Sequence, residues 1–234
     1  FLIASLCILP SYSHSSIDYY FPYHIEPSSS NYGITGILEI PNARFMQEAS
    51  MRFNFSSSYP NEYTSIIASP FNWMEASYRY AEIKNQKYGP SAYSGNQSLK
   101  DKGFDVKFLL MKEGYLKPAI AVGFRDIAGT GLFSSEYIVA SKKINNLDLT
   151  LGLGWGLLGL EDSIKNPFSN FNDSFLNRSS ELGQGGKFSY DSWFSGKTSV
   201  LGGLEYDLKK YGLRIKMEYD TSKPDIRQKI EKVK

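Results

Sequence analysis

Residues 103–156 read GFDVKFLLMKEGYLKPAIAVGFRDIAGTGLFSSEYIVASKKINNLDLTLGLGWG, and this stretch decides the fold class. It contains four segments in which apolar side chains alternate with polar or very small ones, and a period of two predicts β-strands. In the last segment the odd positions from Leu147 to Trp155 are Leu or Trp, whereas the even positions include Asp148, Thr150 and two glycines. Each segment approaches the roughly 9–11 residues that a tilted strand needs to cross a bilayer. We therefore predict two consecutive β-hairpins.

The second face of these strands decides between two kinds of β-structure. In a soluble sandwich the outer face meets bulk water and carries many long charged side chains. Here that face is rich in Gly, Ala, Ser and Thr, which fits a sheet curled round a lumen with its large residues toward lipid. We predict an all-β, antiparallel, up-and-down transmembrane β-barrel, or part of the wall of a larger barrel. A soluble sandwich is the less favoured alternative.

The composition supports a membrane barrel and argues against a nucleic-acid partner. The 234 residues carry a net charge of only +2, and the basic residues are scattered, so no polyanion partner is indicated. Aromatic residues make up 15% of the chain, as is typical of barrels whose aromatic girdles mark the membrane interfaces. The negative mean hydropathy does not oppose this prediction, because only every second strand residue meets lipid.

The same alternation recurs outside the opening stretch and predicts about eight or nine strands in all. Five further strands are expected, at about 51–55, 62–69, 73–83, 198–206 and 213–219. The chain then divides into a signal-peptide remnant over 1–15, a lead-in segment over 16–45 with a short strand between Gly33 and Pro41, a β-barrel region over 46–220, and a polar tail over 221–234 that forms a short helix or a frayed end. Within the barrel region, long loops are expected at 84–102 and at 161–195, the latter outside the barrel or folded into its lumen.

The first ten residues, FLIASLCILP, form an apolar run that is too short to cross a bilayer as a helix. With the small residues that follow, they are typical of a secretory signal peptide. In a lipoprotein Cys7, the single cysteine, would be acylated, but Leu6 stands where lipoprotein signals have a small residue. We favour an ordinary signal peptide, keep lipidation as the alternative, and predict the outer membrane of a Gram-negative cell as the location.

Two chemical motifs lack the context that they need. Residues 154–159 match the spacing G-x-G-x-x-G, but no helical period follows, so a dinucleotide site is not predicted. The two histidines, His14 and His24, both precede the predicted sheet, which argues against a Ser-His-acid triad or a His/Cys metal site in the wall. We predict no catalytic residue, no cofactor and no metal.

Charged residues of both signs occupy the polar faces of the predicted strands and are expected to line the lumen. Their alternating signs favour ion pairs that hold walls and loops in place and offer hydrogen-bonding groups to a polar solute such as a sugar. A pair of catalytic carboxylates drawn from Glu75, Asp105, Glu136 and Glu205 is the less favoured alternative. The lumen candidates are Glu75, Arg79, Asp105, Lys107, Arg125, Glu136 and Arg214.

The order of several segments resembles a known family. The series runs NYGITGILEIPNARF, PFNWMEASYRYAEI, SLKDKGFDVKFLL, KPAIAVGFRDIAGTGLFSSEYIVASKK and DLTLGLGWG, and its most specific part extends from Arg125 to Tyr137. Over about residues 31–220 the chain resembles the N-terminal part of YjbH-type proteins. The resemblance implies a Gram-negative outer-membrane protein associated with exopolysaccharide or capsule production, much longer than this chain and in many relatives a lipoprotein. It implies no catalytic residue.

These observations together predict a non-catalytic outer-membrane β-barrel that assists production or secretion of an extracellular polysaccharide. The expected partners are outer-membrane lipid, the exopolysaccharide chain and other polysaccharide-secretion proteins of the envelope, with no nucleic acid. The alternatives are a structural or adhesive surface barrel with a plugged lumen, a general porin, and an enzyme such as a polysaccharide lyase or deacylase.

Overall fold

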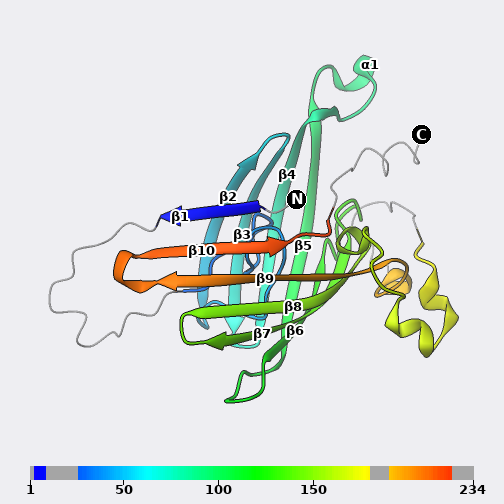
Figure 1. Ribbon diagram of the computed structural model, residues 1–234. Helices are drawn as coiled ribbons and strands as arrows, with labels where there is room; N and C mark the ends of the chain where they lie inside the picture. Colours follow the sequence, from blue (N-terminus) through cyan, green and yellow to red (C-terminus); the bar gives the residue numbers. More distant parts are fainter. Residues whose placement is uncertain (1–2, 9–25, 180–189, 223–234) are drawn as a thin grey trace.

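The computed structural model describes residues 3–8, 26–179 and 190–222 (Figure 1). Its strands form one antiparallel sheet in which each strand from β2 to β9 pairs with the next along the chain, and β1 pairs with β10. The sheet curls into a half-barrel, and Figure 1 shows β2–β5 running nearly crosswise to β7–β10. The strands are β1 (Ile3–Ile8), β2 (Ser50–Ser58), β3 (Asn61–Phe71), β4 (Met74–Lys87), β5 (Ser98–Met111), β6 (Ala119–Arg125), β7 (Ser135–Ile144), β8 (Leu147–Trp155), β9 (Thr198–Leu208) and β10 (Leu213–Tyr219).

Helical elements are few and short. No helix among the described residues is long and apolar enough to cross a membrane. The helical turns are α1 (Ser91–Ser94), η2 (Gly156–Gly159), η3 (Pro167–Asn170), η4 (Asp173–Leu176), η5 (Tyr190–Ser192) and η6 (Lys209–Tyr211).

The all-β, antiparallel, up-and-down prediction is confirmed, and β2–β10 form where about eight or nine strands are predicted. Two details differ. The loop expected over 84–102 is shorter, because β4 continues to Lys87 and β5 begins at Ser98. The short strand expected between Gly33 and Pro41 does not form within the described residues 26–49, which make isolated bridges such as Gly36↔Pro41 instead.

Three predicted segments fall partly or wholly outside the described residues. Of the predicted signal-peptide remnant, Ile3–Ile8 pair with β10 as β1, and the rest is not described. Residues 16–25 and most of the polar tail, 223–234, also lie outside the described residues. The candidate site below involves only β2–β10, their connections and residues 26–49.

The two faces of the sheet differ sharply in chemistry. On the convex face large apolar side chains are exposed, including Phe53 at 68% and Leu151 at 64% of their surface. On the concave face charged side chains are buried, and β10 alternates strictly between buried Arg214, Lys216 and Glu218 and exposed neighbours. The half-barrel is therefore apolar outside and charged inside, the reverse of a soluble domain.

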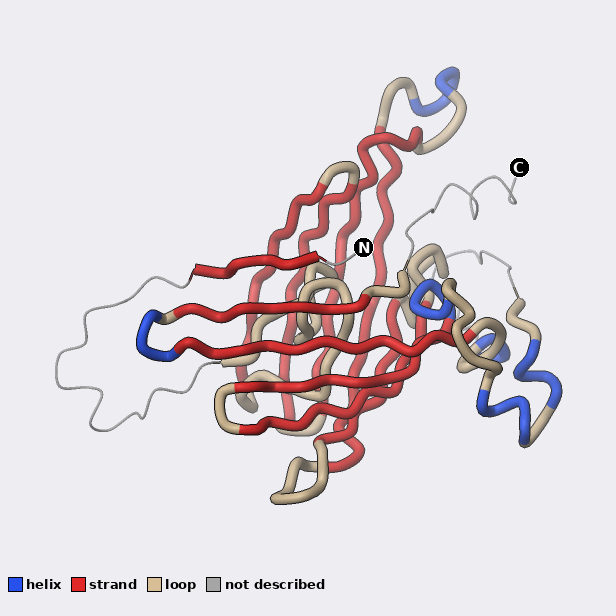
Figure 2. Tube along the Cα trace, viewed as in Figure 1, coloured by secondary structure: helices blue, strands red, loops and turns tan. Residues whose placement is uncertain are grey.

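Residues 26–49, here called the interior segment, fill the hollow of the half-barrel. Figure 2 shows them as a coiled stretch between β2–β5 and β7–β10. Ile37 and Ile40 are buried in a core cluster with Val139 and Leu201 of the sheet. The sequence predicted a lead-in to the barrel here, and the structure places most of that segment inside it. A second cluster packs Tyr32 against Tyr63, Phe133 and Leu157.

The two ends of the half-barrel carry different connections. At one end, here called the short-turn end, the strands are joined by residues 72–73, 112–118, 145–146 and 209–212. At the other, the long-loop end, they are joined by residues 59–60, 88–97, 126–134 and 156–197. The interior segment enters β2 at the short-turn end, because β2 begins there.

Candidate functional site: the charged interior and the segment that fills it

Antiparallel pairing places the predicted lumen residues opposite one another. Glu75 of β4 is the register partner of Lys107 of β5, and Ser77 is that of Asp105. Because side chains of paired residues lie on the same face, these charges share the concave side of the sheet. Six of the seven predicted residues lie on this side, namely Glu75, Arg79, Asp105, Lys107, Arg125 and Arg214.

Glu75 and Lys107 form a fully buried ion pair of 3.0 Å that binds the interior segment. Glu75 accepts hydrogen bonds from the Thr35 hydroxyl at 2.7 Å, the Thr35 amide at 3.2 Å and the Met46 amide at 2.6 Å. Lys107 donates to the carbonyl oxygens of Thr35 at 3.1 Å and Arg44 at 2.5 Å. The pair thus satisfies backbone groups that would otherwise be buried without partners.

On the facing side of the hollow, β10 provides the matching set of contacts. The Glu218 carboxylate accepts hydrogen bonds from three consecutive amides, those of Leu38, Glu39 and Ile40, at 2.8–3.3 Å. Lys216 donates to the Ile37 carbonyl at 2.5 Å. Lys216 and Glu218 are not among the predicted lumen residues, although they alternate with apolar neighbours just as Arg214 does.

Arg125 and Arg214 also contact the interior segment. Arg125 donates to the Glu39 carbonyl at 2.6 Å, and its guanidinium lies 4.1 Å from the centre of the Tyr32 ring. Arg214 donates to the Glu26 carbonyl at 3.1 Å and pairs with Asp207 at 2.6 Å. Both residues therefore bind the segment through its backbone.

Arg79 and Asp105 form a fully buried pair in the interior, with 3.6 Å between their charged atoms. The Arg79 guanidinium is covered by the rings of Phe133, at 4.7 Å, and Tyr32, at 5.3 Å, and its nitrogens have no hydrogen-bond partner among the described residues. Nearby, burial raises the pKa of Asp126, in the connection after β6, to about 7. Cation–π contacts and a loose ion pair together compensate the buried charge of the Arg79 guanidinium.

Glu136 does not line the interior. Its register partner is Phe124, and both lie on the convex face, under the connection 156–197. The Arg178 guanidinium binds its carboxylate with two hydrogen bonds of 2.5 and 2.9 Å. The described parts of the long loop predicted at 161–195 thus pack against the outside of the wall at the long-loop end, where Phe194 also contacts Trp155.

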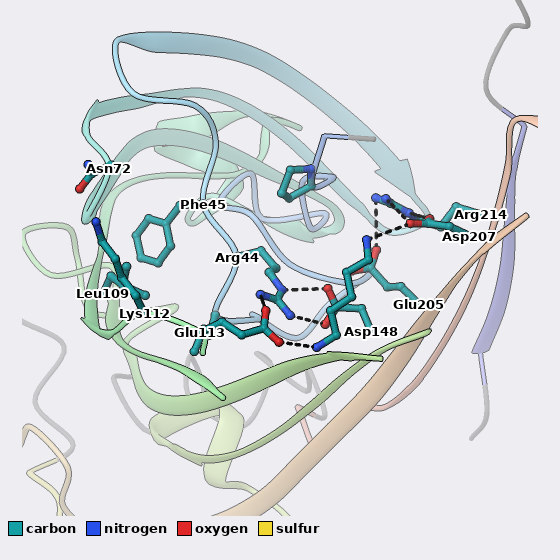
Figure 3. Close-up of a pocket in the computed structure, with 14 residues that line it drawn as sticks. Arg44, Phe45, Asn72, Leu109, Lys112, Glu113, Asp148, Glu205, Asp207 and Arg214 are labelled. Carbon is teal, nitrogen blue, oxygen red and sulfur yellow. Dashed lines mark hydrogen bonds and ion pairs between the residues drawn. The ribbon is translucent and has the colours of Figure 1, made fainter. Parts of the chain in front are cut away.

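At the short-turn end the interior opens into a cavity of about 440 Å³ (Figure 3). Arg44 of the interior segment crosses it and makes two hydrogen bonds, of 2.8 and 2.7 Å, to Asp148 of β8. Its third contact is an ion pair of 2.5 Å with Glu113, in the β5–β6 connection. Arg44 therefore connects the segment to two parts of the wall.

The described residues assemble neither a histidine-based triad nor a metal site. Neither histidine lies within the described residues, and in the described part of the chain no group of three or more His, Cys, Asp or Glu side chains is placed to hold a metal ion. The G-x-G-x-x-G stretch forms the turn η2, where a Cβ on Gly159 would lie 2.2 Å from the Lys197 carbonyl. These glycines thus permit close packing of two backbones.

A family model described as exopolysaccharide biosynthesis protein YbjH matches residues 28–230, which include most of the interior segment and all of β2–β10. The chain belongs to the YjbH family. A relative from Escherichia coli (strain K12), the uncharacterized lipoprotein YjbH, is 40% identical over 201 residues. That match covers 86% of this chain and 29% of the relative, so the chain spans less than a third of that YjbH protein. No solved structure matches the chain.

Proposed function

We propose that this chain is part of the wall of an outer-membrane β-barrel that assists production or secretion of an extracellular polysaccharide without catalysing a reaction. The observation that carries the proposal is the inverted arrangement of the sheet, apolar on its convex face and charged on its concave face. Membership of a family described by exopolysaccharide biosynthesis supplies the process.

The convex face is suited to hydrocarbon. Met51, Phe53 and Phe55 of β2 and Leu151 of β8 are each more than half exposed. Soluble proteins rarely expose contiguous apolar patches beyond a few hundred Å², whereas a lipid-facing barrel wall requires them. Lipid would remove these side chains from water.

The two ends of the half-barrel suggest an orientation. Outer-membrane barrels have short periplasmic turns and longer extracellular loops. The short-turn end would then face the periplasm and the connection 156–197 the outside. Phe71 and Trp73, which stack with ring centres 5.2 Å apart at the short-turn end, would lie at the periplasmic interface.

The interior segment fills the half-barrel, and this separates a general porin from a plugged barrel. A general porin needs an aqueous lumen, whereas here the interior segment is buried against both halves of the sheet. That packing favours, as a second candidate, a structural surface barrel whose plugged interior passes nothing.

The printed name of the Escherichia coli relative, a lipoprotein, supports an envelope location. Acylation of Cys7 stays the alternative to an ordinary signal peptide. Labelling cells with an alkyne fatty acid, with Cys7→Ser as the control variant, would separate the two, because only an acylated chain would lose its label on substitution.

Fractionation of cells tests the location, with recovery in the outer membrane expected. Recovery of the protein in the soluble periplasmic fraction would refute the barrel. A deletion strain tests the process, and we expect lower exopolysaccharide output under inducing conditions. Conductance in planar bilayers tests the plug: steady channel events would favour a porin, and their absence a plugged barrel.

A further inference from the structure

The cavity at the short-turn end brings together parts of the chain that are far apart in sequence. Its wall includes Arg44 and Phe45 of the interior segment, Asn72 of the β3–β4 turn, and Lys112 and Glu113 of the β5–β6 connection. Its volume of about 440 Å³ lies within the ~300–1,000 Å³ of small-molecule sites. The size of the cavity therefore suits a small-molecule ligand.

One wall of the cavity is charged but locally neutral and rigid. The Arg44 guanidinium is held between Asp148 and Glu113, and Asp207 pairs with Arg214 and with Lys143, at 3.4 Å. Each carboxylate oxygen can accept more than one hydrogen bond, so this wall still offers acceptors to hydroxyl groups. It offers no free charge to an ionic ligand.

The opposite wall differs, as Figure 3 shows with Asn72, Leu109 and Lys112 across the cavity from Arg214. Among the described residues the Lys112 ammonium and the Asn72 amide have no ion pair or side-chain hydrogen bond. Between the two walls stands the Phe45 ring, which the Lys107 ammonium approaches to 4.4 Å. This wall thus combines a free cation, a free amide and an aromatic ring.

We propose that this cavity binds a segment of an oligosaccharide that carries a sugar carboxylate, a uronic acid unit. Lys112 would pair with the carboxylate, the Phe45 ring would pack on the apolar face of a pyranose, and the Glu113 and Asp148 carboxylates would accept hydrogen bonds from hydroxyls. One unpaired cation beside a neutral wall suits one negative charge. The inference rests on the proposed function and names its substrate class.

The position of the cavity indicates what a bound saccharide would do there. It opens at the end that the loop asymmetry assigns to the periplasm, and the interior segment closes the path beyond it. A saccharide bound here is held at the periplasmic mouth of the wall. The cavity therefore acts as a capture site rather than as part of a continuous channel.

Calorimetric titration of the whole protein, purified in detergent, tests the inference. The probes are trigalacturonate, the neutral trisaccharide maltotriose and inorganic phosphate. Trigalacturonate is expected to bind at least about tenfold more tightly than maltotriose, and Lys112→Gln to remove that difference. Lys117→Gln is the matched control, because Lys117 lies in the same connection but outside the cavity wall. Phe45→Leu, which keeps an apolar side chain but removes the ring, should weaken both saccharides.

The inference would be overturned by no measurable binding of trigalacturonate, by an equal affinity for maltotriose, or by an equal loss with Lys117→Gln. Competition by phosphate at the same concentration as trigalacturonate would show a simple anion site and would also overturn it. Circular dichroism of each variant verifies folding. Because binding is measured on purified protein, it can persist when deletion leaves exopolysaccharide output unchanged, which would refute the proposed function alone.

Discussion

Glu75 and Lys107 face each other across β4 and β5 at 3.0 Å, and neither side chain has any exposed surface. Such a pair is costly to desolvate, and it is retained where each charge also satisfies other buried groups. Here those groups are the backbone amides and carbonyls of the interior segment. The ion pair is therefore the means by which a polar, coiled segment can be buried inside a sheet.

Removing one member of this pair should destabilise the protein strongly. Glu75→Ala leaves the Lys107 ammonium buried without its counter-charge, and we expect a loss of about 3–5 kcal/mol in the free energy of unfolding. Urea unfolding in detergent micelles measures it, with Glu48→Ala, at an exposed position of the interior segment, as the control. The double variant Glu75→Leu/Lys107→Met should recover part of the lost free energy of unfolding, because it leaves neither charge buried without its partner. An equal effect of Glu48→Ala and Glu75→Ala would contradict the assigned contacts.

A charge on the convex face should oppose membrane insertion. Leu151→Arg places a cation on the exposed face of β8, where the cost at mid-bilayer is about 2–4 kcal/mol. We expect less protein in the outer membrane and faster degradation of the uninserted chain. Tyr93→Arg, in the loop helix α1, serves as the control because Tyr93 is outside the strands and fully accessible. Normal membrane levels of Leu151→Arg would show that this face does not meet lipid.

The ion pair between Arg178 and Glu136, on the outside of β7, should hold the connection 156–197 against the sheet. In Arg178→Ala the Glu136 carboxylate, only 1% exposed, loses two charge-assisted hydrogen bonds, worth about 1.5–3 kcal/mol each. The loop should then become susceptible to added protease while the sheet stays folded. Lys165→Ala, an exposed position of the same connection, should cleave like the parent. Equal protection of both variants would mean that the pair does not hold the loop.

The interior segment should loosen as the pH rises toward neutral. Burial raises the pKa of Glu39 to about 7 from its ordinary value of 4.5, and the Asp220 and Glu218 carboxylates add to the rise. Between pH 4.5 and about 7 the folded state binds more protons than the unfolded state. The free energy of unfolding therefore falls as the pH rises, by at most about 3 kcal/mol for Glu39.

Urea unfolding at several pH values from 4.5 to 8 measures this dependence. Glu39→Gln should flatten it, and the part that remains should come from Asp126, whose pKa is also raised to about 7, and from other buried carboxylates. These are Asp220, whose pKa burial also raises, together with Asp101 and Glu218. Glu48→Gln should keep the full slope. A slope unchanged in Glu39→Gln would show that Glu39 does not titrate in this range.

The sequence alone determined the strands and, for most of them, the two faces. Alternate residues of a strand point to opposite sides whatever its neighbours are, so the polar positions in β4, β5 and β10 could be assigned to one face before any pairing was known. The rule was least informative in β7. There Glu136 and Tyr137 are adjacent, and both are buried. Glu136 lies under the long connection and Tyr137 against the interior. The two faces of β7 therefore lack the difference between exposed apolar and buried polar side chains that marks the outside of the other strands.

Only the tertiary structure decided what fills the half-barrel. Residues 26–49 have no regular period, because their backbone is satisfied by Glu75, Lys107 and Glu218 from strands that follow much later in the chain rather than by a pattern of their own. The cavity beside Arg44 likewise depends on long-range contacts, such as the one between Arg44 and Asp148, which are 104 residues apart in the sequence. Local sequence fixes the direction of each side chain, whereas the partner that it meets depends on how the whole sheet curls.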